Sequence, residues 1–344
     1  RFLATSGTKG EPLPLRYTEN ELSNWKNLVA RTLFTNTFDE TDIVLFPVPI
    51  SQFTGGFGMH EGLRKLNCGI ITTGGMPTKI QVAILNGAYG VRPTAIVSIA
   101  SYMFRIAEVA ESQGIEPTSL GLKKASLGAE PWSEECRKKI EKRFGIKAYD
   151  SYGLGEVWGP GVAAECECDR NSMHGWEDYF HFEVIDNETG DILGENEWGE
   201  LVITPLSKEA MPILRFRTGD KTKINGFECE CGRTHIKINR ITDRFDDLIF
   251  IRGLKIYPNS IEEMLHGIQG VGSEYQIMKP REDSSDPLKL VVEKDKNISV
   301  DDLTSIIENE FKKRFNHRPI VEVVDFGKIP RLPGKAKRIL VAPS

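Results

Sequence analysis

The sequence predicts an α/β protein with a large amino-terminal domain, containing a mostly parallel sheet and a β subdomain, followed by a small mobile α+β domain. Three observations support this prediction. Strand-like and helix-like stretches alternate up to about residue 155, strand-like stretches dominate between about 180 and 240, and a shorter mixed pattern follows. With 344 residues, of which 40% are hydrophobic, the chain can form two or three domain cores. We place the first domain at residues 1–243, its β subdomain at about 180–240, and the carboxyl-terminal domain at 244–344.

The first domain is expected to open with a loop and a helix. In residues 18–34, apolar side chains recur every three or four positions after Thr18, a residue type that caps helix N-termini. The next expected elements are strand 43–48, a glycine-rich turn at 54–58 and a helix at 62–66. The alternation continues through strand 69–72, helix 78–86, strand 95–98, helix 101–113, strand 124–127, helix 133–144 and strand 147–151.

The remainder of the chain changes character twice. The β subdomain is expected to contain strands 182–186, 199–204, 214–217 and 220–224, with a turn at 187–190. A domain boundary is expected near 241–247. Beyond it, the predicted elements are strand 247–251, helix 260–265, strands 275–279 and 289–293, helix 301–315 and strand 320–324.

Charge and hydropathy exclude several classes of protein. The 44 Lys and Arg residues and 49 Asp and Glu residues give a formal net charge of −5, which argues against a nucleic-acid partner. Apolar runs are too short to cross a bilayer and no signal-like segment opens the chain, so we expect no membrane partner and a cytoplasmic protein. Because the chain begins at Arg1 without a methionine, we expect it to be the remainder of a longer protein.

A loop near the start combines hydroxyls, glycines and a lysine. Backbone amides, hydroxyls and an ammonium can face one anion there, which suits a triphosphate. The spacing is not that of a Walker loop, so the P-loop NTPase class is excluded, and an ordinary surface turn is the alternative. The loop comprises Thr5, Ser6, Gly7, Thr8, Lys9, Gly10, Glu11 and Pro12.

Four further motifs follow this loop in order. They are Tyr152-Gly153-Leu154-Gly155-Glu156, Phe216-Arg217-Thr218-Gly219-Asp220, Arg244-Phe245-Asp246-Asp247 leading into Ile251-Arg252-Gly253, and Gly334-Lys335-Ala336-Lys337-Arg338. Together they resemble the adenylate-forming (acyl-CoA synthetase) superfamily. Within it, Gly128-Ala129-Glu130-Pro131-Trp132, residues 153–166 and Trp176-Glu177-Asp178 look like the phenylacetate–coenzyme A ligase family, whose members usually carry a further amino-terminal segment.

The resemblance implies an ATP-dependent aryl-acid–coenzyme A ligase that releases AMP and pyrophosphate. The carboxylate of the acid attacks the α-phosphate of ATP to give acyl-AMP, and the thiol of coenzyme A then displaces AMP. The resemblance also implies Mg²⁺, with Glu156 as its ligand, since this hard cation takes one or two carboxylates and completes its shell with phosphate and water. The alternative for Glu156 is a solvated loop glutamate.

The motifs receive individual roles from the resemblance. Lys335, on a mobile loop, is the leading catalytic residue, because its ammonium can reach both the carboxylate and the α-phosphate as charge develops. Alternatively, it belongs to a solvated basic tail. Asp246 is the expected hinge about which the small domain rotates between half-reactions. The residues expected to bind nucleotide or coenzyme A are Ser6, Gly7, Thr8, Lys9, Gly10, Gly128, Ala129, Glu130, Asp150, Ser151, Tyr152, Asp220, Arg244 and Gly253.

Side-chain chemistry suggests how the substrates are held. Tyr152 offers a ring face to adenine and Asp220 a carboxylate to the ribose hydroxyls, with a core aromatic and a turn residue as the alternatives. An aryl ring fits a pocket where glycines leave room and phenylalanines enclose it. His60 belongs to this pocket or is a core histidine. The expected pocket lining is Phe53, Gly55, Gly56, Phe57 and His60, with Gly128 and Ala129 beside them.

Cysteine and histidine residues point to a second metal. Cys166, His174, Cys229 and Cys231 form a Cys₃His set, which closes a tetrahedral structural zinc site and leaves no ligand position for a substrate. Cys168 and His235 are further candidate ligands, between which the sequence does not choose. Reduced surface thiols are the alternative.

Two other functions remain open. One is an adenylyl transferase of the same family that leaves AMP on its acceptor, such as a deazaflavin AMP-ligating enzyme. The other is a non-catalytic nucleotide- or zinc-binding scaffold. Only the ligase needs coenzyme A to release AMP. The expected partners are therefore an aryl carboxylic acid, ATP and coenzyme A, and the oligomeric state is open, with a homodimer among the options.

Overall fold

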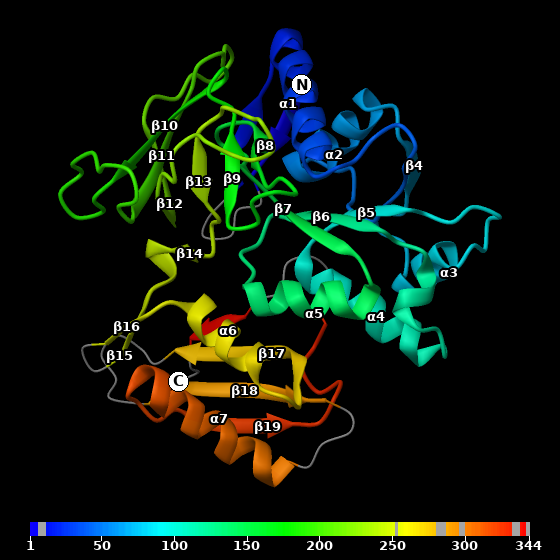
Figure 1. The fold of residues 1–344 in the computed structure, drawn as a ribbon, viewed down its shortest axis with the longest axis vertical. Helices are drawn as coiled ribbons and strands as arrows, with labels where there is room; N and C mark the ends of the chain where they lie inside the picture. Colours follow the sequence, from blue (N-terminus) through cyan, green and yellow to red (C-terminus); the bar gives the residue numbers. More distant parts are fainter. Residues whose placement is uncertain (6–11, 252–253, 280–286, 296–299, 332–337, 342–344) are drawn as a thin grey trace. The chain divides into compact units, whose positions relative to one another are not determined.

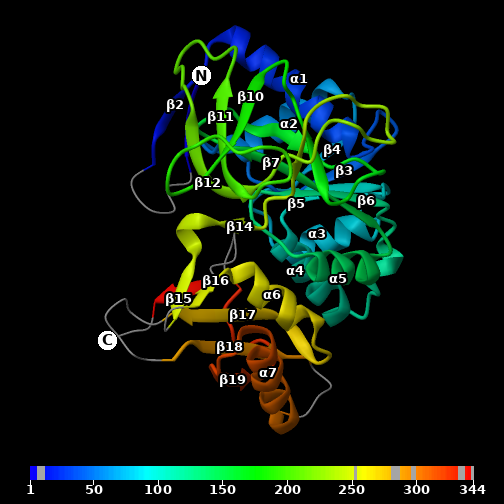
Figure 2. The ribbon, with the colours of Figure 1, turned by 60° about the vertical axis from the view of Figure 1, so that its left-hand side comes forward.

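The computed structural model describes residues 1–5, 12–251, 254–279, 287–295, 300–331 and 338–341. The chain divides into two compact units. The ribbon views colour the chain along its sequence (Figure 1, Figure 2). Unit 1 comprises Arg1–Ile99, Ile106–Ala129 and Glu141–Ile241, and unit 2 comprises Ala100–Arg105, Glu130–Ile140 and Thr242–Ser344. Across the described ranges, no helix combines the length and the apolar character needed to span a membrane.

An eight-stranded sheet forms the centre of unit 1. In spatial order, its strands are β13 (Lys237–Asn239), β9 (Ser172–Gly175), β8 (Gly159–Ala164), β7 (Lys147–Leu154), β6 (Lys124–Gly128), β5 (Ala95–Ser98), β3 (Ile43–Phe46) and β4 (Gly69–Thr72). The five strands from β7 to β4 are parallel, and β8, β9 and β13 extend the sheet in antiparallel pairs. The parallel part confirms the predicted class, whereas β8, β9 and β13 were not predicted.

Helices cover both faces of this sheet. They are α1 (Glu19–Thr35), α2 (Thr54–Lys65), α3 (Thr78–Leu85), α4 (Ala100–Ser112) and α5 (Glu134–Phe144). The first two lie on one face and the other three on the opposite face (Figure 1, Figure 2). The predicted Thr18 cap is confirmed: its side chain accepts from the Glu21 amide, and the Glu21 side chain accepts from the Thr18 amide, as in a capping box. Two short strands, β1 (Phe2–Ala4) and β2 (Pro14–Arg16), pair antiparallel with each other.

The predicted glycine-rich turn at 54–58 is wrong, because these residues form the first turns of α2. Their glycines serve close packing instead of a turn. A Cβ placed on Gly58 would lie 2.4 Å from the Trp25 ring, and one on Gly62 would lie 2.4 Å from Val29. Since Trp25 and Val29 belong to α1, the absence of side chains lets the two helices approach each other closely.

The β subdomain contains an antiparallel set of strands, β10 (Phe180–Ile185), β11 (Gly199–Pro205) and β12 (Phe216–Thr222). The separate strands predicted at 214–217 and 220–224 are wrong, because β12 runs through both. The register between β11 and β12 shifts at this point, and Gly219 has a φ of 75°. A β-bulge therefore accommodates Gly219 without ending the strand.

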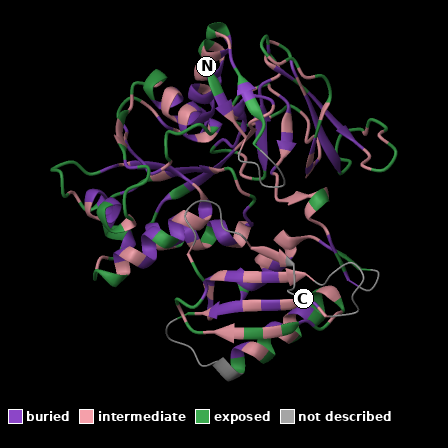
Figure 3. Ribbon diagram, turned by 180° about the vertical axis from the view of Figure 1, so that it is seen from behind, coloured by how far each residue is buried: buried purple, intermediate pink, exposed green. Residues whose placement is uncertain are grey.

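Unit 2 has its own sheet and core. Its elements after residue 241 are β14 (Asp243–Arg244), η2 (Phe245–Asp247), β15 (Ile249–Ile251), β16 (Leu254–Ile256), α6 (Pro258–Gly267), β17 (Val271–Lys279), β18 (Lys289–Lys294), α7 (Val300–Phe315), β19 (Ile320–Val324) and β20 (Ile339–Val341). The sheet order is β19-β18-β17-β20. Buried residues alternate along β17 and pack with Phe311 of α7 in one core (Figure 3). The predicted α+β pattern is confirmed, with β16 and β20 as additional strands.

Candidate functional site

The hydroxyl-rich opening loop is described only at its two ends, since Ser6, Gly7, Thr8, Lys9 and Gly10 lie outside the described residues. Thr5 is described. Its amide donates to the Leu13 carbonyl, and its Oγ1 accepts from the Leu13 amide, both at 3.0 Å. A Cβ on Gly155 would lie 3.4 Å from the Thr5 methyl group and 3.6 Å from Thr54 Oγ1. The start of this loop therefore meets the motif at 152–156.

Tyr152 and Asp220 bring two of the predicted motifs together. The Tyr152 hydroxyl donates to Asp220 Oδ2 at 2.5 Å, although the residues are 68 positions apart. Asp220 is only 4% exposed, and its amide donates to Thr218 Oγ1 at 3.0 Å. A carboxylate held in this way is an oriented acceptor for hydroxyl groups.

The backbones at the ends of β6 and β7 approach each other closely. Gly128 pairs with Ser151 in register, and a Cβ on Gly128 would lie 2.3 Å from the Ser151 carbonyl oxygen. Ala129 follows with a φ of 67°, in the left-handed region. Because ligands bind at the carboxyl ends of strands in α/β sheets, this edge is a suitable place for a flat ring.

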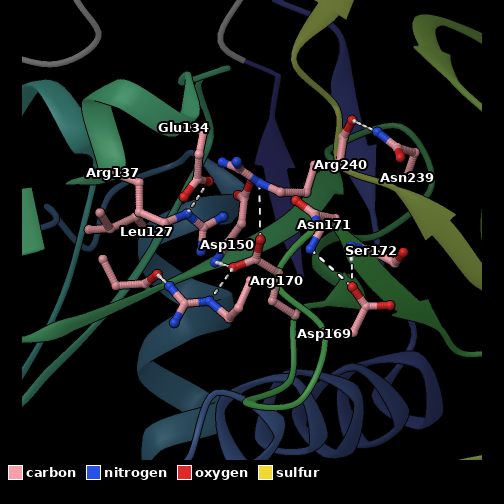
Figure 4. A network of polar contacts seen from close by, with 12 residues as sticks. Leu127, Glu134, Arg137, Asp150, Asp169, Arg170, Asn171, Ser172, Asn239 and Arg240 are labelled. Carbon is pink, nitrogen blue, oxygen red and sulfur yellow. Dashed lines mark hydrogen bonds and ion pairs between the residues drawn. The ribbon is translucent and has the colours of Figure 1, made fainter. Parts of the chain in front are cut away.

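Asp150 was predicted to bind nucleotide, but its carboxylate belongs to a buried charge network (Figure 4). Arg240 Nε lies 3.1 Å from Asp150 Oδ2 and 3.0 Å from Glu165 Oε1. Glu165 Oε2 accepts from the Asp150 amide at 2.7 Å, and Arg170 Nε lies 3.8 Å from the same oxygen. Asp150, Glu165 and Arg240 are all buried. The network thus fixes the segment of β7 that precedes Tyr152.

Glu156 lies in the turn after β7 and is half-buried. Its charge contributes to the pKa values of Tyr17 and Lys208, two residues that the sequence did not single out. Burial raises the pKa of the Tyr17 phenol well above its usual value, and the charges of Glu21 and Glu156 add to this effect. Neither Tyr17 nor Lys208 stands in a recognisable motif, so no signal in the sequence marks them.

Phe53, Phe57 and His60 share one face of α2, since they are spaced four and three positions apart. Their surroundings differ. Phe53 is 41% exposed. The Phe57 ring packs 5.6 Å from the Trp25 ring, and the His60 ring lies 6.3 Å from the Phe46 ring. The exposed end of this face is therefore at Phe53, next to Gly55, whose position leaves open space around an added Cβ.

Arg244 and Asp246 form an ion pair in unit 2. Arg244 Nε lies 3.0 Å from Asp246 Oδ1, and Nη2 lies 3.3 Å from Oδ2. The short helix η2 begins directly after Arg244 and contains Asp246. The predicted catalytic Lys335 and the predicted Gly253 lie outside the described residues.

Glu130 caps α4 within unit 2. Its carboxylate accepts from the Ser101 amide at 2.7 Å and from Ser101 Oγ at 3.1 Å. Burial raises the pKa of Glu130 above its usual range, against the lowering effect of these hydrogen bonds. Its carboxylate oxygens are thus engaged with the start of a helix.

Cys166, His174, Cys229 and Cys231 converge in the β-rich part of unit 1. Their ligand atoms all lie within 4.8 Å of one another. Cys166 Sγ is 3.6 Å from Cys229 Sγ, and Cys231 Sγ is 3.4 Å from His174 Nε2. For tetrahedral zinc with Zn–S bonds of about 2.3 Å, the ligand–ligand edges are about 3.6–3.8 Å. The four residues therefore fit the geometry of a zinc site.

The other candidate ligands lie elsewhere. Cys168 is exposed, and the His235 ring packs edge-on against Trp176 at 5.4 Å. Neither belongs to the group of converging ligand atoms in the described ranges. Burial raises the pKa of Cys166 to about 12 and lowers that of His174 to about 4. The structure thus selects one Cys₃His set among the alternatives.

Comparisons with known proteins match most of the chain. The profile described as AMP-binding enzyme matches residues 2–205, and that described as AMP-binding enzyme C-terminal domain matches residues 253–341. The phenylacetate-coenzyme A ligase of Pseudomonas putida is 40% identical over 293 residues, which are 85% of this chain and 65% of that protein. The Escherichia coli (strain K12) phenylacetate-coenzyme A ligase is 34% identical over 98% of this chain and 78% of its own length. The chain therefore spans just under two thirds of the first of these relatives.

A solved structure extends the comparison to the fold. The crystal structure of 2-hydroxyisobutyryl-CoA ligase in complex with 2-HIB-AMP superposes with a TM-score of 0.92 and 26% sequence identity. The match covers 99% of this chain and 73% of the other.

Proposed function

Since the chain belongs to the AMP-binding enzyme family, we propose that it is an ATP-dependent aryl-acid–coenzyme A ligase acting through an acyl-AMP intermediate. The observation that carries this proposal is the hydrogen bond between Tyr152 and Asp220, together with the contact of Gly155 with Thr5. Three motifs that lie far apart in the sequence thereby meet near the carboxyl end of β7. Both relatives compared above are phenylacetate-coenzyme A ligases by name, which supports the substrate class.

The proposed reaction has two steps. A carboxylate oxygen of the acid attacks the α-phosphorus of ATP, the bond to the bridging oxygen breaks, and pyrophosphate leaves. The thiol of coenzyme A then loses its proton and attacks the acyl carbon, and AMP leaves with the bonding electrons. Such phosphoryl chemistry depends mainly on positioning and on stabilisation of charge.

The residues of unit 1 hold the substrates in this proposal. Asp220 accepts hydrogen bonds from the ribose hydroxyls, with its second oxygen fixed by Tyr152. The backbone of Gly128 and Ala129 is the proposed contact of the adenine ring. Glu156 is the proposed ligand of Mg²⁺, which when bound would neutralise phosphate charge. The aryl ring lies along the exposed end of α2, at Phe53 and Gly55.

Residues 244–344 form the proposed lid domain. Lys335 supplies an ammonium for the developing charge at the α-phosphate, and Arg244 contacts the ribose or phosphates. Asp246 is the proposed hinge, and the segment containing Gly253 serves the thioester step. Arg244 is paired with Asp246, so in this scheme the residue that contacts the nucleotide is also bonded to the hinge residue.

We assign structural zinc to Cys166, His174, Cys229 and Cys231. Three thiolates and one imidazole complete a tetrahedral shell, so the metal would tie the loops around β9 and β13 together without reacting with substrate. Native mass spectrometry should find about one zinc per chain. Metal-free protein with freely titratable thiols at the three cysteine positions, Cys136 serving as the buried reference, would contradict the assignment.

ATP–pyrophosphate exchange tests the ligase proposal. Exchange is measured with phenylacetate, benzoate, a hydroxylated aryl acid, acetate and hexanoate, on the protein at its full natural length. The ligase should exchange with the aromatic acids and should release AMP only when coenzyme A is added. Release of AMP onto a different acceptor without a thiol would instead indicate an adenylyl transferase, and absence of exchange with every acid would indicate a scaffold.

A further inference from the structure

Lys208 carries a buried ammonium. The residue is 8% exposed, and its Nζ has no hydrogen-bond partner among the described residues. Burial lowers the pKa of Lys208, against the opposing effect of Glu21 and Glu156. Removing an ammonium from water without a partner is unfavourable, so a fold that keeps it there needs a compensating interaction.

The backbone around Lys208 is firmly held. The fully buried Glu21 carboxylate accepts from the Glu209 amide at 2.9 Å and from the Ala210 amide at 3.3 Å. The Glu209 carboxylate accepts in turn from Thr18 Oγ1 and Asn20 Nδ2, each at 2.5 Å. The two residues directly after Lys208 are thus fixed to the first turn of α1, and the Leu206 amide before it donates to the Tyr179 carbonyl at 2.8 Å.

The ammonium lies against the motif that contains Glu156. Lys208 Nζ is 4.9 Å from the centre of the Tyr17 ring, and the Tyr17 hydroxyl donates to the Trp158 carbonyl at 3.1 Å. Trp158 is two positions beyond Glu156 in the same turn. A ring face attracts a cation, but it leaves the three N–H donors of the ammonium without acceptors.

The site has two distinguishable ends. Tyr152 and Asp220 mark one end, suited to hydroxyl groups of a ribose. Gly155 and Thr5 mark the other, where the hydroxyl-rich loop starts. Lys208 packs on the Tyr17 ring, and the Tyr17 hydroxyl is bonded to the Trp158 carbonyl in the turn that begins at Gly155, so Lys208 belongs to the second end.

We infer that Lys208 is a further nucleotide-binding residue, whose ammonium donates hydrogen bonds to the β- and γ-phosphate oxygens of ATP. The inference rests on the proposed function, since it takes ATP as the substrate. Phosphate oxygens supply the acceptors that the buried Nζ lacks, and their negative charge offsets its desolvation. Lysine is well suited to this task as a compact point charge.

Isothermal titration with ATP and with AMP, in the presence of Mg²⁺ and without any acid, tests the inference. Loss of a charged hydrogen bond in Lys208→Met should raise the Kd for ATP roughly 10- to 100-fold. The Kd for AMP, which lacks the β- and γ-phosphates, should change less than about threefold. Lys208→Arg should recover part of the ATP affinity. This difference between nucleotides is a readout that a purely structural role would not produce.

Lys223→Met is the matched control. Lys223 also places its ammonium near an aromatic ring, 5.4 Å from Trp198, and is half-buried in the same unit. The ATP affinity of the Lys223→Met protein should equal that of the wild type. Equal weakening of ATP and AMP in Lys208→Met, or unchanged ATP affinity, would overturn the inference. So would failure of both Lys208→Met and Lys208→Gln to fold, because the ammonium would then stabilise the apo protein. Wild-type protein that binds neither nucleotide would instead contradict the proposed function itself.

Discussion

Gly55 and Gly56 are neighbours in the first turn of α2 but have opposite surroundings. A Cβ on Gly56 would lie 2.0 Å from the Pro49 carbonyl oxygen and 2.8 Å from the Pro49 carbonyl carbon, whereas a Cβ on Gly55 would meet no atom within 4 Å. We therefore predict opposite effects of Gly56→Ala and Gly55→Ala on the free energy of unfolding.

The magnitude follows from the contact distances. Cβ atoms do not approach other heavy atoms below 3.0 Å, so Gly56→Ala must push α2 and the Pro49 backbone apart by about 1 Å. Overpacking of this kind costs about 1–3 kcal/mol. Gly55→Ala instead gains up to about 1 kcal/mol of helix propensity. The two variants should thus differ by about 1–4 kcal/mol, or roughly 2–16 °C in Tm.

Thermal and urea denaturation of the two variants and the wild type provide the measurement. A Gly56→Ala protein at least as stable as Gly55→Ala would refute the reasoning, because the close approach to Pro49 would then not constrain the helix. Gly55→Val adds a functional readout. If Gly55 borders the aryl ring, kcat/KM for phenylacetate should fall relative to acetate, while the Kd for ATP stays unchanged.

Three further predictions concern substitutions of charged residues. Arg240→Met should lower the free energy of unfolding by about 3–5 kcal/mol in urea denaturation, because two buried carboxylates lose their partner, and a loss below about 1 kcal/mol would contradict this. Burial acts to raise the pKa of Asp178, but hydrogen bonds from Arg31 outweigh it and lower the pKa below its usual value. The loss of stability caused by Arg31→Met should therefore be largest above the ordinary carboxyl pKa and should shrink as the pH falls through the pKa of Asp178 in the folded protein. A loss independent of pH would count against the ion pair. Lys335→Ala should slow acyl-AMP formation at least about 100-fold but leave thioester formation from supplied acyl-AMP largely intact, and equal loss of both steps would mean a structural role.

Periodicity in the sequence predicts most of the fold. Helix α1 ends within one residue of its predicted limit, and β4, β5 and β19 have their predicted bounds. The first turns of helix α2 were predicted as a turn, because four glycines within nine residues have low helix propensity. The reason for those glycines is tertiary: α1 and the Pro49 backbone fill the space that side chains would take. Such a reason cannot be read from the local sequence.

The candidate site shows the same division between local and tertiary information. Sequence spacing indicated a Cys₃His set but could not choose among six candidate ligands, whereas the folded chain brings four of them together. The order of the motifs indicated that residues near 152 and 220 cooperate, and the structure adds the bond that links Tyr152 with Asp220. Lys208 was not predicted, since burial without a hydrogen-bond partner is a property of the folded chain alone.

Asp150 and Asp220 illustrate why residue type does not determine a role. Both are buried aspartates assigned to the nucleotide from the sequence, yet Asp150 pairs with Arg240 and Asp220 accepts a hydrogen bond from Tyr152. Asp150 precedes Tyr152 by two positions on β7, so its side chain lies on the same face of the strand. The buried ion pair therefore acts on the position of the Tyr152 hydroxyl through the strand that carries both residues. An aspartate in this motif can thus support the site by holding the strand, while the neighbouring tyrosine and the distant aspartate carry the groups proposed to meet the substrate.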